Sequence, residues 1–427
     1  MPVSTIRLYS RDDLGALDWP ATEDGDYARR YLTPFMTNGP QAYLRNARAA
    51  IYALRAGPVV LPVTVSDFDL ANSYVCSPYA HYVTYGQEEL FNLKNPPVEA
   101  ALRLLFRPLA WYFRRGALDR AVLVNNWLLP TNLYPSGVAE HAAQMVDHLA
   151  AAFPDRAVIF RSVDARANAD LLAALRARGG RPVFSRSIYY QDVSSACVQR
   201  RRDYRADLKC YQHTPYRMLD GADLGPDDAE RIVELYDDLY LRKYSYCNPQ
   251  FTPEFVRLAL AERLLTIKAL AHNGRIDAAL GYFGRRGFIT APLFGYDTQL
   301  PKDLGLYRLL TMLMSLDARE HGWTVHLSAG VGRFKRLRDG LPVIEYNAVF
   351  DEHLPASRRR PWRLLQSAAT CPSAWCPAPR WKPAAVCRPA GSSAAAACAS
   401  ATGRPARQAR TWARRRRARP WPMPAWR

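Results

Sequence analysis

The chain has 427 residues, 49% of them hydrophobic, with 58 Lys and Arg against 39 Asp and Glu and a net charge of +19. That length suggests two or three domains with real hydrophobic cores, and it excludes a disulfide-stapled miniprotein, a collagen-like fibre and a wholly disordered chain. The charge is concentrated near the end: sixteen basic residues and no acidic residue follow Glu352, so residues 1–352 carry only +3.

Strand-like and helix-like segments alternate through the first half of the chain. Runs rich in β-branched and aromatic residues predict strands, and apolar residues at helical spacing predict helices. The predicted strands are 59–65, 73–85, 121–129, 157–161 and 182–192, and the predicted helices are 137–152, capped by Ser136, and 169–178. Segment 102–115 is basic and aromatic, as a helix at a membrane interface would be, but Pro108 interrupts it and we expect a packed helix.

The second half gives clearer local signals. Helix 227–244 has one apolar face, and helix 252–263 begins with a Thr cap followed by proline at the first helical position. Strands 266–272, 275–283 and 288–296 form an antiparallel meander, since Asn273-Gly274 is a residue pair favoured in two-residue hairpin turns. Helix 305–321, strand 324–328, a helical turn at 333–338 and strand 343–350 complete the order.

The two halves share the order strand, helix, strand, helix, strand. This order predicts an α+β protein built from a duplicated unit, each copy a mostly antiparallel sheet flanked by helices. We expect the first unit at 1–195, a basic connector at 196–219, the second unit at 220–355 and a tail at 356–427.

The tail has an unusual composition. Residues 367–427 contain no Leu, Ile, Phe, Tyr, Asp, Glu or Asn. Without aliphatic side chains such a segment cannot bury enough apolar surface to offset chain entropy, which predicts disorder. Its Arg and Trp residues suit a basic arm for nucleic acid or an anionic membrane. A G+C-rich gene read out of frame gives the same composition, and we favour that explanation.

The cysteines and the apolar segments of the sequence bear on the cellular location of the protein and on metal binding. The four cysteines before the tail are far apart and have no His at zinc spacing, which is typical of isolated thiols in a reducing compartment. The N-terminus lacks the apolar core of a secretory signal, and no uncharged run is long enough to span a bilayer. We therefore expect a cytoplasmic protein with no transmembrane segment and no metal.

Several catalytic motifs are absent from the sequence. It contains no G-x-x-x-x-G-K-[ST] phosphate loop, no G-x-S-x-G nucleophile elbow and no H-E-x-x-H pair. These absences argue against P-loop phosphoryl transfer, serine hydrolysis and metallohydrolysis.

A polar cluster remains around strands 288–296 and 324–328. If these strands are neighbours, their ends meet at Gly305, where the intervening helix begins, and a helix N-terminus can hold a pyrophosphate. Splayed strand ends also leave main-chain amides free for an extended ligand or an oxyanion. The cluster consists of Tyr296, Asp297, His326, Ser328, Gly330, Phe334 and Lys335.

Short motifs in this region carry a family resemblance. They are Tyr296-Asp297, Leu304-Gly305-Leu306, Ala318, Gly322, Gly330 followed by Phe334-Lys335, and Gly340. Residues 220–350 thereby resemble a GNAT-type acyltransferase domain of the FemAB-like variant, and 160–164, 171–179 and 182–192 resemble its companion unit. The resemblance implies two tandem GNAT-like units that move an acyl group from a thioester, usually acyl-CoA, to an amine. FemAB-like relatives take aminoacyl groups from tRNA.

The resemblance also implies roles for individual residues. The donor's pyrophosphate would be held by Leu304, Gly305, Leu306, Tyr307 and Arg308. The substrates would contact Tyr296, His326, Gly330 and Phe334. The catalytic candidates are Asp297, Lys335 and Ser328.

The chemistry of amide formation defines these catalytic roles. Asp297 could accept the amine proton, and Lys335 could neutralise charge on the donor or in the transition state. Asp297 could equally be a turn residue, and Lys335 a surface lysine. The connector's basic residues, Arg201, Arg202, Arg205 and Lys209, fit either a phosphate-bearing partner or a solvated surface.

Three functions are therefore compatible with the sequence. The first is a cytoplasmic N-acyltransferase that uses acyl-CoA and a small-molecule amine. The second is a FemAB-like aminoacyltransferase that uses charged tRNA. The third is a protein that binds nucleic acid or an anionic surface through its basic tail.

Overall fold

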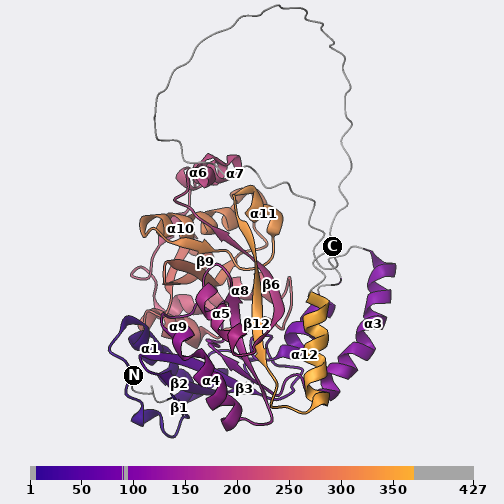
Figure 1. The fold of residues 1–427 in the computed structure, drawn as a ribbon. Helices are drawn as coiled ribbons and strands as arrows, with labels where there is room; N and C mark the ends of the chain where they lie inside the picture. Colours follow the sequence, from indigo (N-terminus) through magenta and orange to yellow (C-terminus); the bar gives the residue numbers. More distant parts are fainter. Residues whose placement is uncertain (1–5, 89, 91–94, 370–427) are drawn as a thin grey trace, which may run out of the picture. The chain divides into compact units, whose positions relative to one another are not determined.

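The computed structural model describes residues 6–88, 90 and 95–369, which form one mixed 12-stranded sheet with helices on both faces (Figure 1). The strands are β1 (Ile6–Tyr9), β2 (Ala50–Ala56), β3 (Val59–Ser66), β4 (Ala121–Val124), β5 (Ala157–Asp164), β6 (Arg181–Gln191), β7 (Arg217–Leu219), β8 (Thr266–His272), β9 (Arg275–Arg285), β10 (Phe288–Tyr296), β11 (Thr324–His326) and β12 (Leu341–Phe350). The helices are α1 (Glu23–Asn38), α2 (Tyr85–Glu88), α3 (Pro96–Arg115), α4 (Val138–Ala152), α5 (Ala169–Ala177), α6 (Ala196–Arg200), α7 (Arg202–Gln212), α8 (Ala229–Tyr240), α9 (Pro253–Ala261), α10 (Leu306–Glu320), α11 (Gly332–Leu337) and α12 (Ala356–Ala369).

The strand order is the same when it is counted from either edge of the sheet. It runs β1-β2-β3-β4-β5-β12-β6-β11-β10-β9-β8-β7. The strands from β1 to β5 therefore occupy the same positions from one edge as the strands from β7 to β11 occupy from the other edge. In each half the first four strands are antiparallel and the fifth joins in parallel, as β4 with β5 and β10 with β11. This pattern is a mixed, mainly antiparallel α/β architecture with internal repetition.

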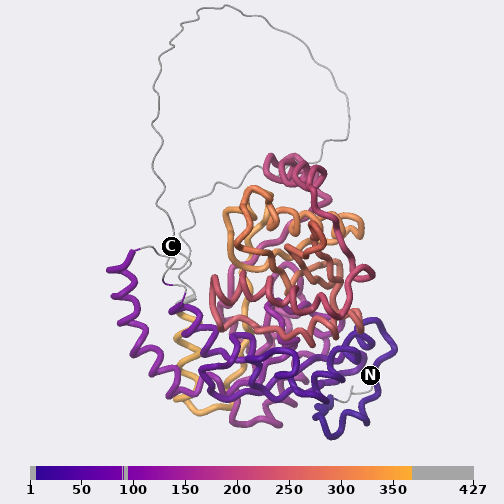
Figure 2. Tube along the Cα trace, turned by 180° about the vertical axis from the view of Figure 1, so that it is seen from behind, coloured from indigo at the N-terminus to yellow at the C-terminus, as the bar shows by residue number. Residues whose placement is uncertain are grey.

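The two halves exchange their last strands. β12 pairs with β5 of the first half, and β6 pairs with β11 of the second half. β6 and β12 then pair with each other at the centre of the sheet. Figure 2 shows the result: the yellow end of the described chain returns to the purple segments of the first half. The domain boundaries expected from the sequence stay a prediction.

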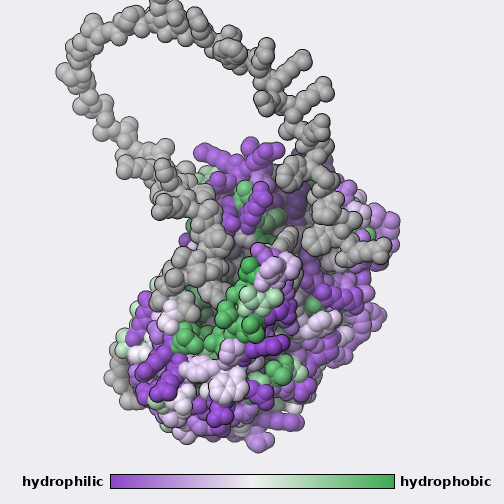
Figure 3. All heavy atoms as spheres, turned by 90° about the vertical axis from the view of Figure 1, so that its right-hand side faces the viewer, coloured by the Kyte–Doolittle hydropathy of each residue, from purple (hydrophilic) through white to green (hydrophobic). Residues whose placement is uncertain are grey.

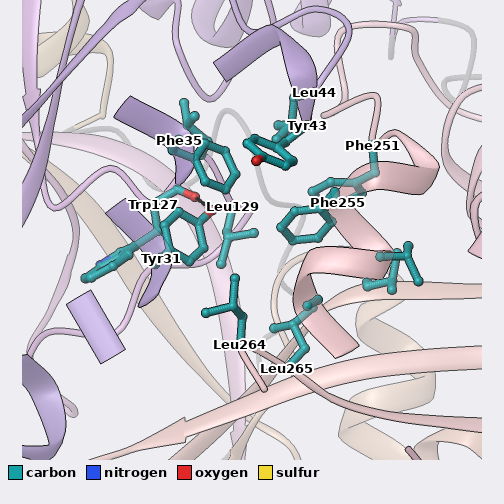
Figure 4. Close-up of a cluster of buried hydrophobic side chains, with 14 of the residues drawn as sticks. Tyr31, Phe35, Tyr43, Leu44, Trp127, Leu129, Phe251, Phe255, Leu264 and Leu265 are labelled. Carbon is teal, nitrogen blue, oxygen red and sulfur yellow. Dashed lines mark hydrogen bonds between the residues drawn. The ribbon is translucent and has the colours of Figure 1, made fainter. Parts of the chain in front are cut away.

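Apolar side chains on both faces of the sheet hold the helices. In the first half, α4 and α5 cover one face, while α12 and the end of α3 cover the other. In the second half, α10 covers one face and α8 and α9 the other. Figure 4 shows that α1 and α9 meet in an aromatic cluster, in which Tyr31 stacks on Phe35 and Phe35 approaches Phe255. This cluster ties the first half to the second.

The local signals of the second half are confirmed. The Thr252 hydroxyl accepts a hydrogen bond from the Phe255 N–H, so α9 begins as the Thr-Pro pair predicts. Asn273 and Gly274 have positive φ angles of 50° and 77°, as the two-residue turn between β8 and β9 requires.

Three predictions in the first half are wrong. Segment 73–85 is not a strand but turns that lead into a π-helical turn at Ala80–Thr84. The Ser77 hydroxyl accepts the Ala80 N–H and the Asp119 carboxylate accepts the Tyr79 N–H, and such side-chain caps override the strand propensity of Tyr and Val. The predicted strand 121–129 ends at Val124, and Gly137 rather than Ser136 is the N-cap of α4.

The predicted connector and tail also contain helices. Segment 196–219 forms α6 and α7, and α7 packs against α10 and α11. Within the predicted tail, Ala356–Ala369 forms α12 and buries Trp362, and the remainder, 370–427, lies outside the described residues. Within the described ranges, no helix is both long and apolar enough to cross a membrane.

Candidate active site

The parallel strands β10 and β11 separate after three residue pairs. Their register runs from Phe288 opposite Thr324 to Thr290 opposite His326, and β10 then continues to Tyr296 without β11 but still paired with β9. Pro292 explains where the pairing ends, because proline has no N–H to donate and the register with β9 also shifts here. The strands are therefore neighbours, as the sequence interpretation assumed, and they leave a gap that we call the C-terminal wedge.

Helix α10 begins beside the C-terminal wedge with unpaired N–H groups. Its N-cap, Gly305, is left-handed with φ 69°, a conformation that glycine adopts without strain. A Cβ at this position would lie 3.1 Å from the Cys210 sulfur of α7, so glycine also allows the two helices to approach. No side chain of the described chain caps this end, which leaves the N–H groups of Leu306, Tyr307 and Arg308 as donors for an anion.

Aromatic rings from three elements gather at this helix end. The Tyr307 ring lies 4.9 Å from the Phe334 ring and 6.2 Å from the Tyr296 ring, measured between ring centroids. All three side chains are half-buried rather than sealed in the core. The predicted residues Tyr296, Tyr307 and Phe334 are therefore brought together, on β10, α10 and α11. Leu304 ends the turn that precedes Gly305.

His326, Ser328 and Lys335 form a second group at the end of β11. His326 is buried, and its Nδ1 accepts a hydrogen bond from the Ser328 N–H at 3.0 Å. The Lys335 Nζ donates to the carbonyl oxygens of Ser328 and Ala329 at 3.1 and 2.7 Å. Ser328 itself is left-handed with φ 57°, and the exposed Gly330 follows it. Lys335 thus holds the backbone that borders the C-terminal wedge.

Burial changes the protonation of both basic groups. Lys335 is only 2% exposed, and burial, assisted by the Arg186 charge, lowers its pKa to about 7. Burial likewise lowers the pKa of His326 to about 4, so its ring is neutral at pH 7. The surface-lysine alternative is wrong for Lys335. A neutral lysine that donates two N–H bonds keeps a lone pair free to accept a proton.

A largely buried ion pair lies near this group. Arg186 donates two hydrogen bonds of 2.9 Å to the carboxylate of Glu345, one from each of two guanidinium nitrogens. Burial alone would raise the pKa of Glu345, but Arg186 holds it below its usual value. The pair joins β6 to β12, and the positive charge of Arg186 contributes to the lowered pKa of Lys335.

Asp297 lies apart from these two groups. Its carboxylate accepts hydrogen bonds from Arg231 of α8 at 3.0 Å and Arg275 of β9 at 3.2 Å. Burial would raise its pKa, but a bond from the Gln299 N–H and the charge of Arg231 lower it. α8 and α10 pack on opposite faces of the sheet, so these contacts favour a structural role over that of a proton acceptor.

An arginine-lined cleft of about 690 Å³ adjoins the aromatic group. Phe334 belongs to both, and Arg308 and Arg338 of the cleft are ion-paired with the buried Asp207 of α7. Arg202 and Arg333 also line the cleft, and within the described chain neither has a carboxylate partner. Sequence reasoning missed Asp207, Arg333 and Arg338.

The connector is the source of part of this cleft. Arg202 lines it, whereas Arg201 forms an ion pair with Asp339 and Arg205 and Lys209 are exposed on α7. The signal that could have revealed the cleft is the run of basic residues between Arg333 and Arg338, which has the spacing of a helix and continues the basic character of the connector.

No protein-family model matches this sequence, and no curated protein matches it significantly. Similar solved structures include the C-terminal domain of a putative lysylphosphatidylglycerol synthetase from Agrobacterium fabrum, with 13% identity, TM-score 0.42, and coverage of 58% of this chain and 82% of that one. FemX has 8% identity, TM-score 0.41 and coverage of 53% and 78%. A tandem GNAT protein from the clavulanic acid biosynthesis pathway has 10% identity, TM-score 0.34 and coverage of 82% and 100%. Values this low carry no argument about function.

Proposed function

We propose that this protein is an N-acyltransferase of GNAT-like fold, in which two tandem units share one sheet and the second unit holds the active site. The observation that carries the proposal is the C-terminal wedge, which opens beside the uncapped start of α10 and next to an arginine-lined cleft. A gap between parallel strands, with a helix N-terminus beside it, suits an extended acyl donor that carries phosphates. The motif resemblance of 296–340 supports the same reaction class.

The donor's phosphates would bind at two adjoining places. The uncapped N–H groups of Leu306, Tyr307 and Arg308 at the start of α10 would donate to one phosphate. Arg202 and Arg333 supply positive charge without a carboxylate partner, and guanidinium groups bind phosphate oxygens in pairs. Four arginines around one cleft match a donor with several phosphates, and acyl-CoA is the first candidate.

Lys335 is the residue to which we assign proton transfer. The amine attacks the donor carbonyl and a C–N bond forms. The C–S bond of the thioester breaks as the oxyanion collapses, and the leaving thiolate takes up the proton that the amine has lost. Lys335, with its pKa near 7, takes the amine proton directly or through a water. The N–H groups of β10 beyond Thr290 that no longer pair with β11 would stabilise the oxyanion.

Aminoacyl-tRNA is a second candidate donor, and one observation favours it. Arg205 and Lys209 are exposed on α7 beyond the cleft, so the basic surface extends past what one coenzyme would cover. A polynucleotide backbone would use such a surface, and its binding would weaken steeply with salt. Transfer of the aminoacyl group would otherwise follow the same steps, with the C–O bond of the tRNA ester broken instead of C–S.

Direct titration of the full chain tests the proposal. Acetyl-CoA and an aminoacyl-tRNA are each titrated by calorimetry, with adenosine and uncharged tRNA as matched controls. We expect one of the two donors to bind more tightly than its control, and thiol release or loss of the aminoacyl ester to follow when amines are added. Failure of both donors to bind would overturn the acyltransferase assignment.

A further inference from the structure

Helix α3 presents a wide apolar face to solvent. Leu104, Leu105 and Trp111 are 64%, 66% and 62% exposed, whereas core leucines of this protein are almost fully buried. Val98 extends the same face by two further turns. Figure 3 shows green apolar side chains gathered in a strip on the side of the molecule where α3 lies, with purple polar side chains around it.

Among the described residues, α3 packs through a narrow set of side chains. Phe113 packs near Trp362 of α12 in a small apolar cluster, and Figure 1 shows α3 beside α12. Phe106 is the other fully packed side chain of α3. Pro108 lies within the helix and cannot donate to the carbonyl of Leu104. The Leu104 carbonyl therefore needs a hydrogen bond from water or from a lipid headgroup. This requirement suits a helix that lies in the headgroup region of a bilayer rather than in its hydrocarbon core.

Positive charge borders the apolar face. α3 carries four arginines and one glutamate, a net charge of +3. Arg103 pairs with Glu99, and Arg115 lies 5.4 Å over the Trp111 ring. Arg107 is exposed and has no partner among the described residues. Leu and Trp on one side with Arg on the other is the pattern of helices that lie in a bilayer surface.

We propose that α3 docks the protein on an anionic lipid surface. Leu104, Leu105 and Trp111 enter the boundary between headgroups and acyl chains, and Arg103 and Arg107 contact lipid phosphates. The charge of α3 argues against two other occupants of its apolar face. A second copy of α3 would place a charge of +3 against +3. Residues 370–427 contain basic but no acidic residues, so they would also be repelled by α3. An anionic bilayer complements both the apolar strip and its arginines.

Vesicle binding by the full chain tests this proposal. Purified protein is sedimented with vesicles of phosphatidylcholine alone and of phosphatidylcholine with phosphatidylglycerol. We expect binding to the mixed vesicles, and a loss of at least ~10-fold in partitioning for L104E/L105E, since burying two leucines contributes several kcal/mol. The control L70E changes a leucine that is 62% exposed outside α3 and leaves partitioning unchanged. R103Q/R107Q lowers binding to the mixed vesicles only.

Four results would overturn the proposal. They are no vesicle binding by the full chain, equal losses for L70E and L104E/L105E, unchanged binding of L104E/L105E, and a dimer in light scattering that L104E/L105E converts to a monomer. The third result would assign binding to another basic segment, and the fourth would assign the face to a second copy. All substituted side chains are exposed, so thermal unfolding should match that of the unmodified chain.

Discussion

The two halves of the sheet have the same elements at corresponding positions, but different side chains occupy the space around the parallel strands. In the first half, β4 and β5 are the parallel pair and α4 follows a left-handed Gly137, as α10 follows Gly305. Ser162 and Ser328 even share a left-handed φ, 56° and 57°, each two residues after the last parallel pair. We call the corresponding position, where β4 and β5 stop pairing, the N-terminal wedge.

The N-terminal wedge is closed by its own chain. Almost all of the connection between β4 and α4 is buried, and Trp127 and Leu129 enter the core shared with α1 and α9 (Figure 4). The Tyr134 hydroxyl donates to the carbonyl of Arg161 at 2.6 Å, and Asn132 reaches Ser162. In the second half most of the corresponding connection, 297–305, is exposed or half-buried. The chain therefore fills the N-terminal wedge, whereas the connection beside the C-terminal wedge is less buried, and this difference agrees with a ligand site in the second half alone, as we propose.

The helices after the parallel pairs differ in one decisive side chain. The fourth residue of α11 is the buried Lys335, and the fourth residue of α5 is the buried Leu172. Leucine contributes only packing, whereas lysine with a lowered pKa can transfer a proton. The comparison predicts that chemistry resides in the second half alone.

Converting Lys335 to leucine should give the largest effect. K335L makes the second half resemble the first, and we expect turnover to fall by ~10²–10⁴-fold, the usual contribution of a positioned base. Donor affinity should stay within about two-fold, because Lys335 contacts backbone rather than the cleft. The measurement is turnover and donor binding of K335L and K335R side by side. Unchanged turnover would remove Lys335 from the mechanism.

The pH dependence of K335L supplies an independent readout. Below pH 7 the lysine is protonated in both the folded and unfolded states, and its burial costs stability in full. Between about 7 and 10.5 only the unfolded lysine keeps its proton, so the stability of the unmodified protein should rise with pH, by up to ~1.4 kcal/mol per unit. K335L should lack this slope in urea unfolding.

Opening the N-terminal wedge should cost stability and leave the reaction intact. L129A removes a fully buried leucine from the aromatic core, which should lower the free energy of unfolding by ~2–5 kcal/mol. The matched variant is L300A, in the half-exposed connection after β10, with an expected loss below ~1 kcal/mol. Urea unfolding and donor titration measure both. Weaker donor binding in L129A alone would show that the first wedge also binds ligand.

Reversing charge in the cleft should give the smallest effect. R202E/R333E should weaken donor binding by at least ~10-fold, because two cations that face the phosphates become anions. R176E, an exposed arginine on α5, is the control from the first half and should change nothing. Calorimetric titration at two salt concentrations distinguishes the two variants. Equal losses would mean that the effect is long-range and not specific to the cleft.

Local sequence signals predicted much of the second half because each is read over a few residues. Asn273-Gly274 fixes a turn, and Thr252 with Pro253 starts a helix, whatever lies elsewhere in the chain. Pro292 could have indicated where β10 stops pairing, since its missing N–H is visible in the sequence. The strand predicted at 73–85 failed because Asp119, more than thirty residues away, caps a helical turn there.

The site was only partly predictable for the same reason. His326, Ser328 and Lys335 were named from their spacing, and the structure brings them together. That Lys335 is buried and that Asp297 faces two arginines depends on long-range contacts, from Arg186, Arg231 and Arg275. No local sequence pattern predicts these partners, and none predicts the pairing of β5 with β12.

That last pairing has a consequence during synthesis on the ribosome. β5 is complete at Asp164, yet its neighbour β12 begins only at Leu341. At translation speeds of ~5–20 residues per second, the nascent first half waits roughly 10–35 s with an unsatisfied row of backbone donors and acceptors. In a polypeptide cut between the halves, β5 has no β12 in its own fragment to pair with. We therefore expect that neither fragment reaches the native fold alone.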